Sequence, residues 1–459
     1  MHKQNRGMVE GPLFSGMMFY TIPIIISGIL QLLFNAADLV IVGQFGQSGS
    51  NAVAAVGCTG AISALIINFF IGFSAGSGVT VAHAIGAKDS DYVHKAVHTI
   101  IPLAIIGGTV ISVIGVFLAE PLLILMDTPA EILPLAITYM QIIFAGTLPN
   151  VVYNFGSSVL RAAGDSKRPL YFLLIAGVIN LGLNLIFVLC LKMDIAGVAL
   201  ATIISYLVSA VLVVFALIKR QDDCKLNLKK IRFHPEPLKK IFRMGFPAGI
   251  QSSIFSVSNV IIQTSLNGLD AIPQYAGVVA GSAAATNIQN FAFMTNEGFR
   301  QTAMNYIGQN SAAGRFDRVR KISHICFMST AVLGVIVGIL LTIFSKPLLS
   351  IYITDSPQAV YWGSVRMMYI CLPFFIAGLM DVTTGVLRGL GQSVFPMIAS
   401  IMGICVLRVA WIYTIFKIPA FHTPESLFIS YIISWVLTFI VQYVVIKIVI
   451  NKKLRAHKR

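Results

Sequence analysis

The chain has few charged residues and lacks the patterns that mark soluble enzymes. Charged residues make up 11% of the 459 positions, against about 25% in a typical soluble domain. Hydrophobic residues make up 56%, and the mean hydropathy is +0.83. The sequence contains no phosphate-binding loop, no metal-ligand spacing and no nucleophile–base pair. These absences exclude a soluble globular protein and argue against an enzyme, and we expect no cofactor.

Paired cysteines are also missing. No C-x-x-C motif occurs, and most of the six cysteines lie in or beside apolar runs: Cys58, Cys190, Cys224, Cys326, Cys371 and Cys405. We expect small buried hydrophobic side chains rather than disulfides or metal ligands.

Nucleic acid is not an expected partner, although 33 basic residues outnumber 18 acidic ones. No RNA- or DNA-binding signature accompanies the basic residues, which fall in short segments between apolar runs. One set of connecting segments carries most of them: Lys88, Lys95, Arg161, Lys167, Arg168, residues 219–243, Arg315, Arg318, Arg320, Lys321 and residues 452–459. The opposite loops hold only Lys192, Lys346 and Lys417. This asymmetry predicts a cell-membrane protein with both termini in the cytoplasm.

About twelve apolar runs are long enough to cross a bilayer as helices, at roughly twenty residues each. They lie near 16–43, 52–84, 96–118, 132–156, 169–191, 195–218, 244–268, 276–308, 322–345, 359–386, 396–417 and 426–450. Because six spans return the chain to the same side, the two halves run parallel. The sequence predicts an all-α membrane protein of two six-helix lobes related by a pseudo-twofold axis along the membrane normal.

The predicted division places one lobe at 1–218, a basic cytoplasmic linker at 219–243, the second lobe at 244–450 and a basic tail at 451–459. Near the end of the linker, Leu238, Ile241 and Phe242 share one helical face with cations around it. We expect this face to lie on anionic lipid headgroups.

A repeated turn supports the duplication. The pattern Val-Leu-Arg-x-x-Gly-x-Ser-x-x-Pro occurs at 159–169 and again at 386–396, about half the chain apart. Each copy separates two apolar runs, so glycine supplies a permissive backbone and proline begins the next helix. The turn residues are Arg161, Gly164 and Pro169 in the first copy and Arg388, Gly391 and Pro396 in the second. A purely structural turn without chemistry is the alternative interpretation.

The first spans of the two halves share a second repeated pattern. Pro23 is followed twelve residues later by Asn35, and Pro247 is followed at the same interval by Asn259. We expect these two asparagines to line a substrate cavity.

Three acidic residues fall well inside the spans: Asp38, Glu297 and Asp381. A charge near a helix centre costs about 2.5–3.5 kcal/mol on insertion scales. We therefore expect each acid to be paired with a cation, to be protonated or to have a functional role. Asp38 has no Lys or Arg within a helical turn. Since burial disfavours a charged carboxylate, Asp38 suits a group that takes and releases a proton. The alternative is a hydrogen-bonded residue that joins helices.

The acids of the second half have cations nearby. Glu297 and Arg300 are three positions apart and can pair on one helix face, as a structural ion pair or as a coupling site. Asp381 lies before Arg388, so helix capping or an ion pair competes with a coupling role. We expect the remaining intramembrane cations, Arg366 and Arg408, to pair with Glu297 or Asp381.

Asn180 and Asn184 lie four residues apart and therefore share a face of the fifth span. Hydrogen bonding between helices is their plainest role.

Taken together, these residues resemble the multidrug and toxic compound extrusion family over essentially the whole chain. The resemblance rests on Pro23, on Phe34-Asn-Ala-Ala-Asp38, on Val42-Gly43, on the repeated turn, on Asn180 and on Ile307-Gly-Gln-Asn310.

The resemblance implies a monomeric transporter whose lobes rock around a central cavity and export cationic, amphipathic compounds. Export would be driven by exchange for H⁺ or Na⁺, with H⁺ favoured and Na⁺ the only metal ion expected. Asp38 would be the proton-linked group, opposite Asn180, and Asp381 matches an acid that another branch uses. One position departs from the pattern, because Asn184 stands where an aspartate is common.

Two alternatives remain open. A flippase or exporter of a lipid-linked or other anionic precursor, from the same broad superfamily, would want a cationic cavity, and the arginines at 300, 366 and 408 favour it. A membrane-embedded enzyme lacks its catalytic residues.

Overall fold

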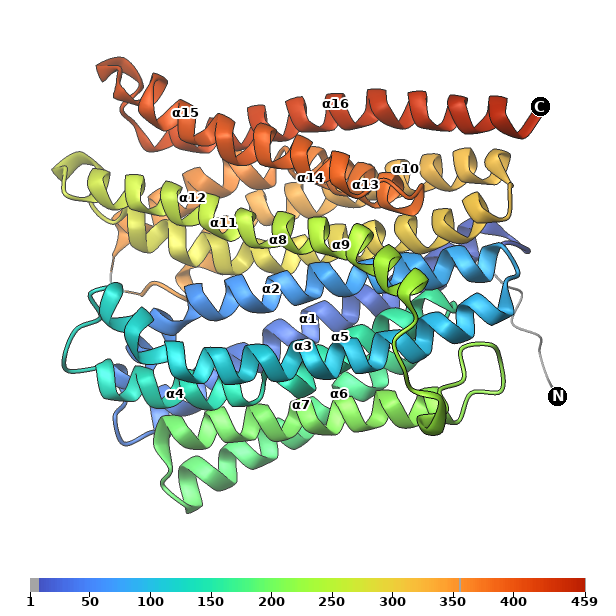
Figure 1. The fold of residues 1–459 in the computed structure, drawn as a ribbon. Helices are drawn as coiled ribbons and strands as arrows, with labels where there is room; N and C mark the ends of the chain where they lie inside the picture. Colours follow the sequence, from blue (N-terminus) through green and yellow to red (C-terminus); the bar gives the residue numbers. More distant parts are fainter. Residues whose placement is uncertain (1–7, 355, 459) are drawn as a thin grey trace. The chain divides into compact units, whose positions relative to one another are not determined.

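The computed structural model describes residues 8–354 and 356–458, and within this part the chain forms helices and no β-strand (Figure 1). The predicted cytoplasmic N-terminal end, residues 1–7, and Arg459 lie outside the described residues. The all-α class predicted from the sequence is confirmed.

Two compact units divide the chain. One contains the described residues of Met1–Ile25 and Ile254–Arg459, and the other contains Ile26–Ser253. Both boundaries fall inside long helices, α1 (Leu13–Phe45) and α8 (Pro235–Asp270). Each of these helices therefore contributes its first turns to one unit and the remainder to the other. The lobe limits predicted at 218 and 244 stay a prediction.

The unit Ile26–Ser253 holds most helices of the first half. They are α2 (Ser50–Gly86), α3 (Ser90–Leu125), α4 (Leu133–Ala145), α5 (Thr147–Ala162), α6 (Lys167–Leu185), the π-helical turn η1 (Ile186–Cys190) and α7 (Asp194–Ile218). The start of α8 belongs here because α2 packs closely against it. A Cβ added to Gly76 would lie 2.3 Å from the Gly245 nitrogen. The Phe73 ring contacts Phe155 and Phe242, with centroids 5.5 and 5.2 Å away.

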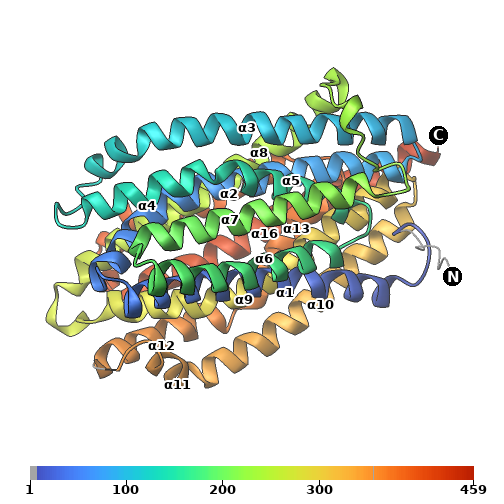
Figure 2. The same cartoon turned by 90° about the horizontal axis from the view of Figure 1, so that it is seen from below.

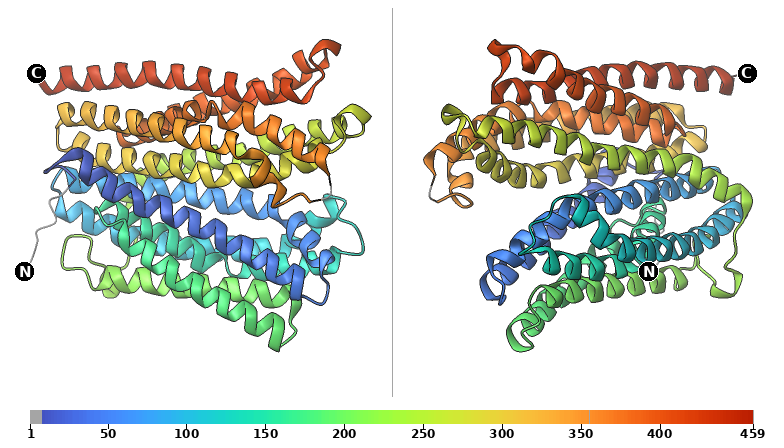
Figure 3. Two further views of the ribbon diagram at one scale, coloured as in Figure 1. Left: turned by 180° about the vertical axis from the view of Figure 1, so that it is seen from behind. Right: turned by 60° about the vertical axis from the view of Figure 1, so that its left-hand side comes forward.

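The other unit holds the helices of the second half. They are α9 (Val278–Ala312), α10 (Phe316–Ile343), α11 (Ser345–Ser350), α12 (Pro357–Cys371), α13 (Phe374–Gly389), α14 (Val394–Ser400), the π-helical turn η4 (Ile401–Val406), α15 (Leu407–Tyr413) and α16 (Pro424–Lys458). Helix α16 runs alongside α13 (Figures 1 and 3). The first turns of α1 pack on α9, where the Thr21 and Thr302 hydroxyls lie 2.7 Å apart.

Two predicted spans are broken. Helices α4 and α5 meet at 43° and α12 and α13 meet at 48°, so the spans predicted at 132–156 and 359–386 are bent pairs. Proline explains both breaks, because Pro149 and Pro373 have no N–H to donate to the carbonyl four residues earlier.

Apolar helices account for most of the predicted spans. Among the described residues, eight helices are long and apolar enough to cross a membrane, and the two bent pairs bring the number to ten. Helices α8 and α9, labelled in Figure 2, occupy the positions of two further predicted spans and are not among these ten. Counted with α8 and α9, the helices of the described chain match all twelve predicted spans.

The repeated turns share one backbone conformation. Gly164 has φ of +88° and Gly391 has φ of +85°. In each turn the glycine N–H donates to the carbonyl of the arginine three residues earlier, Arg161 or Arg388, at 3.0 and 2.9 Å. Pro169 and Pro396 lie in the first turns of α6 and α14. The left-handed conformation, open to glycine without strain, explains why this residue recurs.

Two backbone N–H groups of the linker donate hydrogen bonds to side chains of α3. The Asn227 N–H donates to His98 Nε2 at 2.9 Å, and the His234 N–H donates to Thr99 Oγ1 at 3.1 Å. Ile241 is fully buried in the core of its unit, and Leu238 packs against that core. Phe242, the third residue of this face, is 43% exposed. The expectation that the segment contacts lipid headgroups stays a prediction.

Candidate functional site

Asp38 lies half-buried on α1, within the unit Ile26–Ser253, and accepts hydrogen bonds on both carboxylate oxygens. Asn184 Nδ2 on α6 donates to Oδ1 in a short hydrogen bond. Thr202 Oγ1 on α7 lies 3.2 Å from Oδ2. Three helices thus converge on one carboxylate.

A buried amide pair extends this network. Asn180 and Asn184 share a face of α6, as their spacing predicts, and Asn184 Nδ2 also donates to Asn180 Oδ1 at 3.2 Å. Asn180 Nδ2 lies 3.5 Å from Thr202 Oγ1. Both asparagines are almost fully buried. The structure therefore brings Asp38, Asn180 and Asn184 together and adds Thr202.

Sequence reasoning missed the contribution of α7. Thr202 lies within an apolar run, and Tyr206 follows one helical turn later on the same face. Tyr206, and Tyr139 on α4, lie close enough to interact electrostatically with Asp38. Polar residues at this spacing in a span were the available signal, because a membrane helix buries such a face only against protein.

No cation neutralises Asp38 among the residues that the structure describes. An ionised carboxylate is acceptor-only, and two donors satisfy it here. A protonated carboxyl must donate from one oxygen, and the buried Asn184 Oδ1 has no hydrogen-bond partner. Rotation of the Asn184 amide would present this acceptor to the acid. The site can therefore hold Asp38 in either protonation state.

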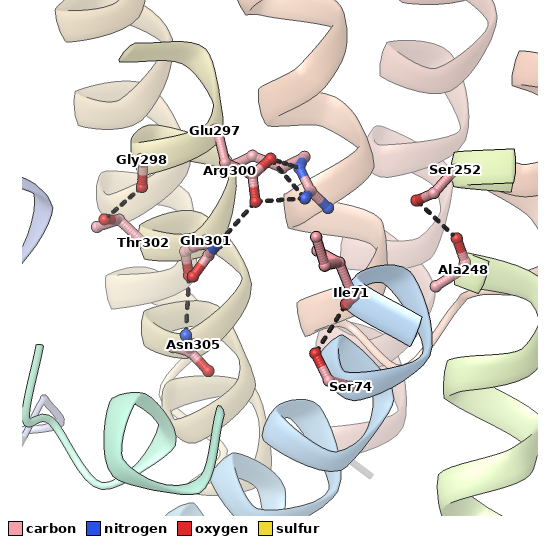
Figure 4. Close-up of polar contacts among 10 residues, drawn as sticks. All are labelled: Ile71, Ser74, Ala248, Ser252, Glu297, Gly298, Arg300, Gln301, Thr302 and Asn305. Carbon is pink, nitrogen blue, oxygen red and sulfur yellow. Dashed lines mark hydrogen bonds and ion pairs between the residues drawn. The ribbon is translucent and has the colours of Figure 1, made fainter. Parts of the chain in front are cut away.

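The second unit contains the predicted pair on α9. Arg300 Nε donates to Glu297 Oε2 at 2.8 Å, and Gln301 Nε2 donates to Glu297 Oε1 at 2.6 Å (Figure 4). The Glu297 side chain is 30% exposed and that of Arg300 is 14% exposed. The i, i+3 spacing places both groups on one face, where they neutralise each other.

Asp381 is half-buried on α13, and its electrostatic neighbours are Arg300, Glu297 and Arg388. Its helix packs directly against α9. The structure thus places Glu297, Arg300 and Asp381, three charged groups of the second half, in one electrostatic cluster.

The two cavity asparagines lie apart from these networks. Asn35 on α1 and Asn259 on α8 are exposed, and neither side chain makes a hydrogen bond with another described residue. Their role as cavity residues stays a prediction.

The expected pairing of Arg366 and Arg408 with Glu297 or Asp381 is wrong. Neither arginine forms an ion pair within the described chain. Both instead lie against aromatic rings of α16, so tertiary packing and not charge pairing decides their positions.

A family model described as MatE matches residues 23–186 and 247–414. The chain is 26% identical to the probable multidrug resistance protein YoeA of Bacillus subtilis, over 84% of both chains. It is 28% identical to the probable multidrug resistance protein YpnP of the same organism, over 87% of both chains.

Two further similarities concern a named substrate and the fold. The chain is 24% identical to a FAD transporter of Shewanella oneidensis, over 88% of this chain and 87% of that one. A solved MOP superfamily transporter from Pyrococcus furiosus matches 100% of both chains with a TM-score of 0.89 at 21% identity.

Proposed function

Because the chain belongs to the MatE family, whose members are membrane transporters and not enzymes, we propose that it exports cationic amphipathic compounds in exchange for protons. The names of the Bacillus subtilis relatives, both probable multidrug resistance proteins, support drug efflux as the activity.

The observation that carries the proposal is the uncompensated Asp38 carboxylate. Two neutral donors, Asn184 and Thr202, satisfy it, and no arginine or lysine pairs with it in the described chain. An intramembrane acid in this setting is a functional site by default. When ionised, it offers a counter-charge to a cationic substrate. When protonated, it is neutral and no longer offers a counter-charge.

Coupling follows if the proton and the substrate compete for Asp38. Proton uptake makes Asp38 a donor, and two responses are open to the network. The Asn184 amide can turn its oxygen toward the carboxyl and give up its hydrogen bond to Asn180 Oδ1. Alternatively, Asp38 Oδ2 can donate to the Thr202 hydroxyl, which then donates only to the Val198 carbonyl, 3.0 Å away. The hydrogen bonds of the ionised and protonated forms therefore differ, and protonation shifts the network from one form to the other. The lobes would then alternate between access from the two sides, with both termini and the 219–243 linker in the cytoplasm of a cell-membrane protein.

Sodium is the alternative coupling ion. The carboxylate, amide and hydroxyl oxygens of Asp38, Asn184 and Thr202 are also suitable ligands for a hard cation such as Na⁺. Asp381, near Glu297 and Arg300, is the second group that could take part in coupling.

Dye efflux from proteoliposomes tests the proposal. The purified chain is reconstituted, loaded with a fluorescent cationic dye, and exposed separately to a proton gradient and to a sodium gradient of the same size. We expect efflux under the proton gradient alone. Efflux driven only by sodium would show that Na⁺, and not H⁺, is the coupling ion. No efflux under either gradient would contradict the proposal of cation-coupled export.

A further inference from the structure

Two buried arginines share one aromatic ring in the unit that contains Ile254–Arg459. The Arg408 guanidinium carbon lies 3.9 Å from the Tyr431 ring centroid, and the Arg366 guanidinium carbon lies 5.7 Å from the same centroid. Arg366 also lies 5.5 Å from the Phe428 ring. The arginines come from α12 and α15 and the rings from α16. Three helices therefore place two positive charges around Tyr431.

Cation–π contact only partly replaces the solvation of a guanidinium, which carries five N–H donors. Arg408 Nε donates to Ser434 Oγ at 3.1 Å. Arg366 Nε has no hydrogen-bond partner, although the residue is only 6% exposed. One helical turn earlier on α12, the buried Trp362 Nε1 also lacks an acceptor. The cluster thus presents unsatisfied donors and no matching acceptor.

The charge of this cluster is uncompensated as well. No carboxylate of the described chain pairs with Arg366 or Arg408, and the intramembrane acids Glu297 and Asp381 interact with other arginines. Burying two like charges without a counter-ion is expensive in a membrane. An anion with oxygen acceptors would satisfy both the charges and the open N–H groups.

We propose that Arg366 and Arg408, arranged around Tyr431, form with Trp362, one helical turn before Arg366, a binding site for a phosphate or carboxylate group carried by an amphipathic small molecule. This inference rests on the proposed function in that it adds to its substrate class: compounds with an anionic group are accepted alongside cationic ones. The similarity to a protein named FAD transporter is consistent with it.

Intrinsic fluorescence offers a direct readout, because all three tryptophans of the sequence flank the cluster. Trp362 precedes Arg366 by one helical turn, Trp411 follows Arg408 on α15, and the Trp435 ring lies 5.9 Å from Tyr431. The full chain in phosphatidylcholine nanodiscs is titrated with phenyl phosphate, with neutral benzyl alcohol and with benzyltrimethylammonium. We expect saturable quenching by phenyl phosphate alone.

Variants assign the response to the cluster. Arg366→Gln and Arg408→Gln should each weaken phenyl phosphate binding about tenfold or more, as expected for one lost charge-assisted hydrogen bond. Arg320→Gln, at an exposed position whose Nη2 bonds Asn451, is the matched control and should bind normally. If a glutamine variant does not fold, Arg366→Lys and Arg408→Lys retain the charge and should bind with intermediate affinity.

A second arm separates the sources of the anion. The titration is repeated in nanodiscs containing phosphatidylglycerol, whose headgroup carries the same phosphate chemistry. Competition by this lipid, lost in the arginine variants, would support the site with a headgroup as an occupant. The absence of any arginine-dependent response to either anion, or equal binding of benzyl alcohol, would overturn the proposal. No transport is involved, so this failure is distinct from a failure of proton-coupled export.

Discussion

The Asn184 amide donates to the Asp38 carboxylate across 146 positions of sequence. Asn184 is fully buried, its other amide hydrogen is directed to Asn180, and its oxygen has no partner. This one contact links the only proposed proton site of the first half to a helix that could respond to protonation. The first two predictions concern this network.

Asp38→Asn should abolish gradient-driven export while the protein remains inserted and folded. The substitution removes the group that binds the proton, and it also removes an insertion cost of about 2.5–3.5 kcal/mol, so stability should not fall. Dye efflux and thermal unfolding of the purified protein measure the two effects. Asp127→Asn, at an exposed position, is the control and should export normally. Wild-type efflux in Asp38→Asn at equal expression would contradict the assignment of Asp38 as the proton-coupling group.

Thr202→Val should slow export severalfold, whereas Thr202→Ser should retain it. Valine keeps the shape but removes the hydroxyl that lies 3.2 Å from Asp38 Oδ2, and a hydrogen bond to a charged group contributes about 1.5–3 kcal/mol. The initial rate of dye efflux as a function of pH is the measurement. Equal rates in the valine and serine variants would show that the hydroxyl is not used.

Glu297→Gln should destabilise the protein more than the double variant Glu297→Gln with Arg300→Gln. Breaking a buried pair on one side typically costs about 3–5 kcal/mol because it leaves an unpaired charge, and the partial exposure of Glu297 places this pair at the lower end. A double-mutant cycle on thermal unfolding measures the coupling. Additive effects would contradict the pairing.

Asp381→Asn should weaken export of cations without lowering thermal stability. Its carboxylate forms no ion pair within the described chain, so the substitution breaks none, whereas Glu297 is paired with Arg300. Dye efflux and thermal unfolding are the measurements. A Glu297→Gln protein that stays fully stable yet binds no cationic dye would reverse the two roles.

Gly164→Ala should destabilise the protein by roughly 1–2 kcal/mol through its backbone, because an L-residue is strained at φ of +88°. Nothing lies within 4 Å of a Cβ at this site, so steric contact does not contribute. Gly182→Ala is the control, since it also meets nothing within 4 Å but lies within α6, where alanine should add about 0.5–1 kcal/mol. Equal melting shifts for the two variants would rule out the backbone explanation.

The architecture follows from local properties of the sequence. Long apolar runs form helices because lipid leaves backbone groups no other partners. The repeated turn was recognisable because glycine at positive φ and proline in the first helical turn satisfy requirements within a few residues, at Gly164 and Gly391 alike. The Glu297–Arg300 pair was predictable for the same reason, since both groups lie on one helix.

Contacts between distant segments were decided only by the tertiary structure. Thr202 contacts Asp38 because the fold brings α7 to α1, although the two residues are 164 positions apart. Arg366 and Arg408 contact Tyr431 instead of an acid, because the packing of α12, α15 and α16 fixes which side chains meet. A single sequence states which residues are too polar for lipid, but it does not state their partners. Helix spacing sets the face on which a side chain lies, and only the packing of helices sets what that face contacts.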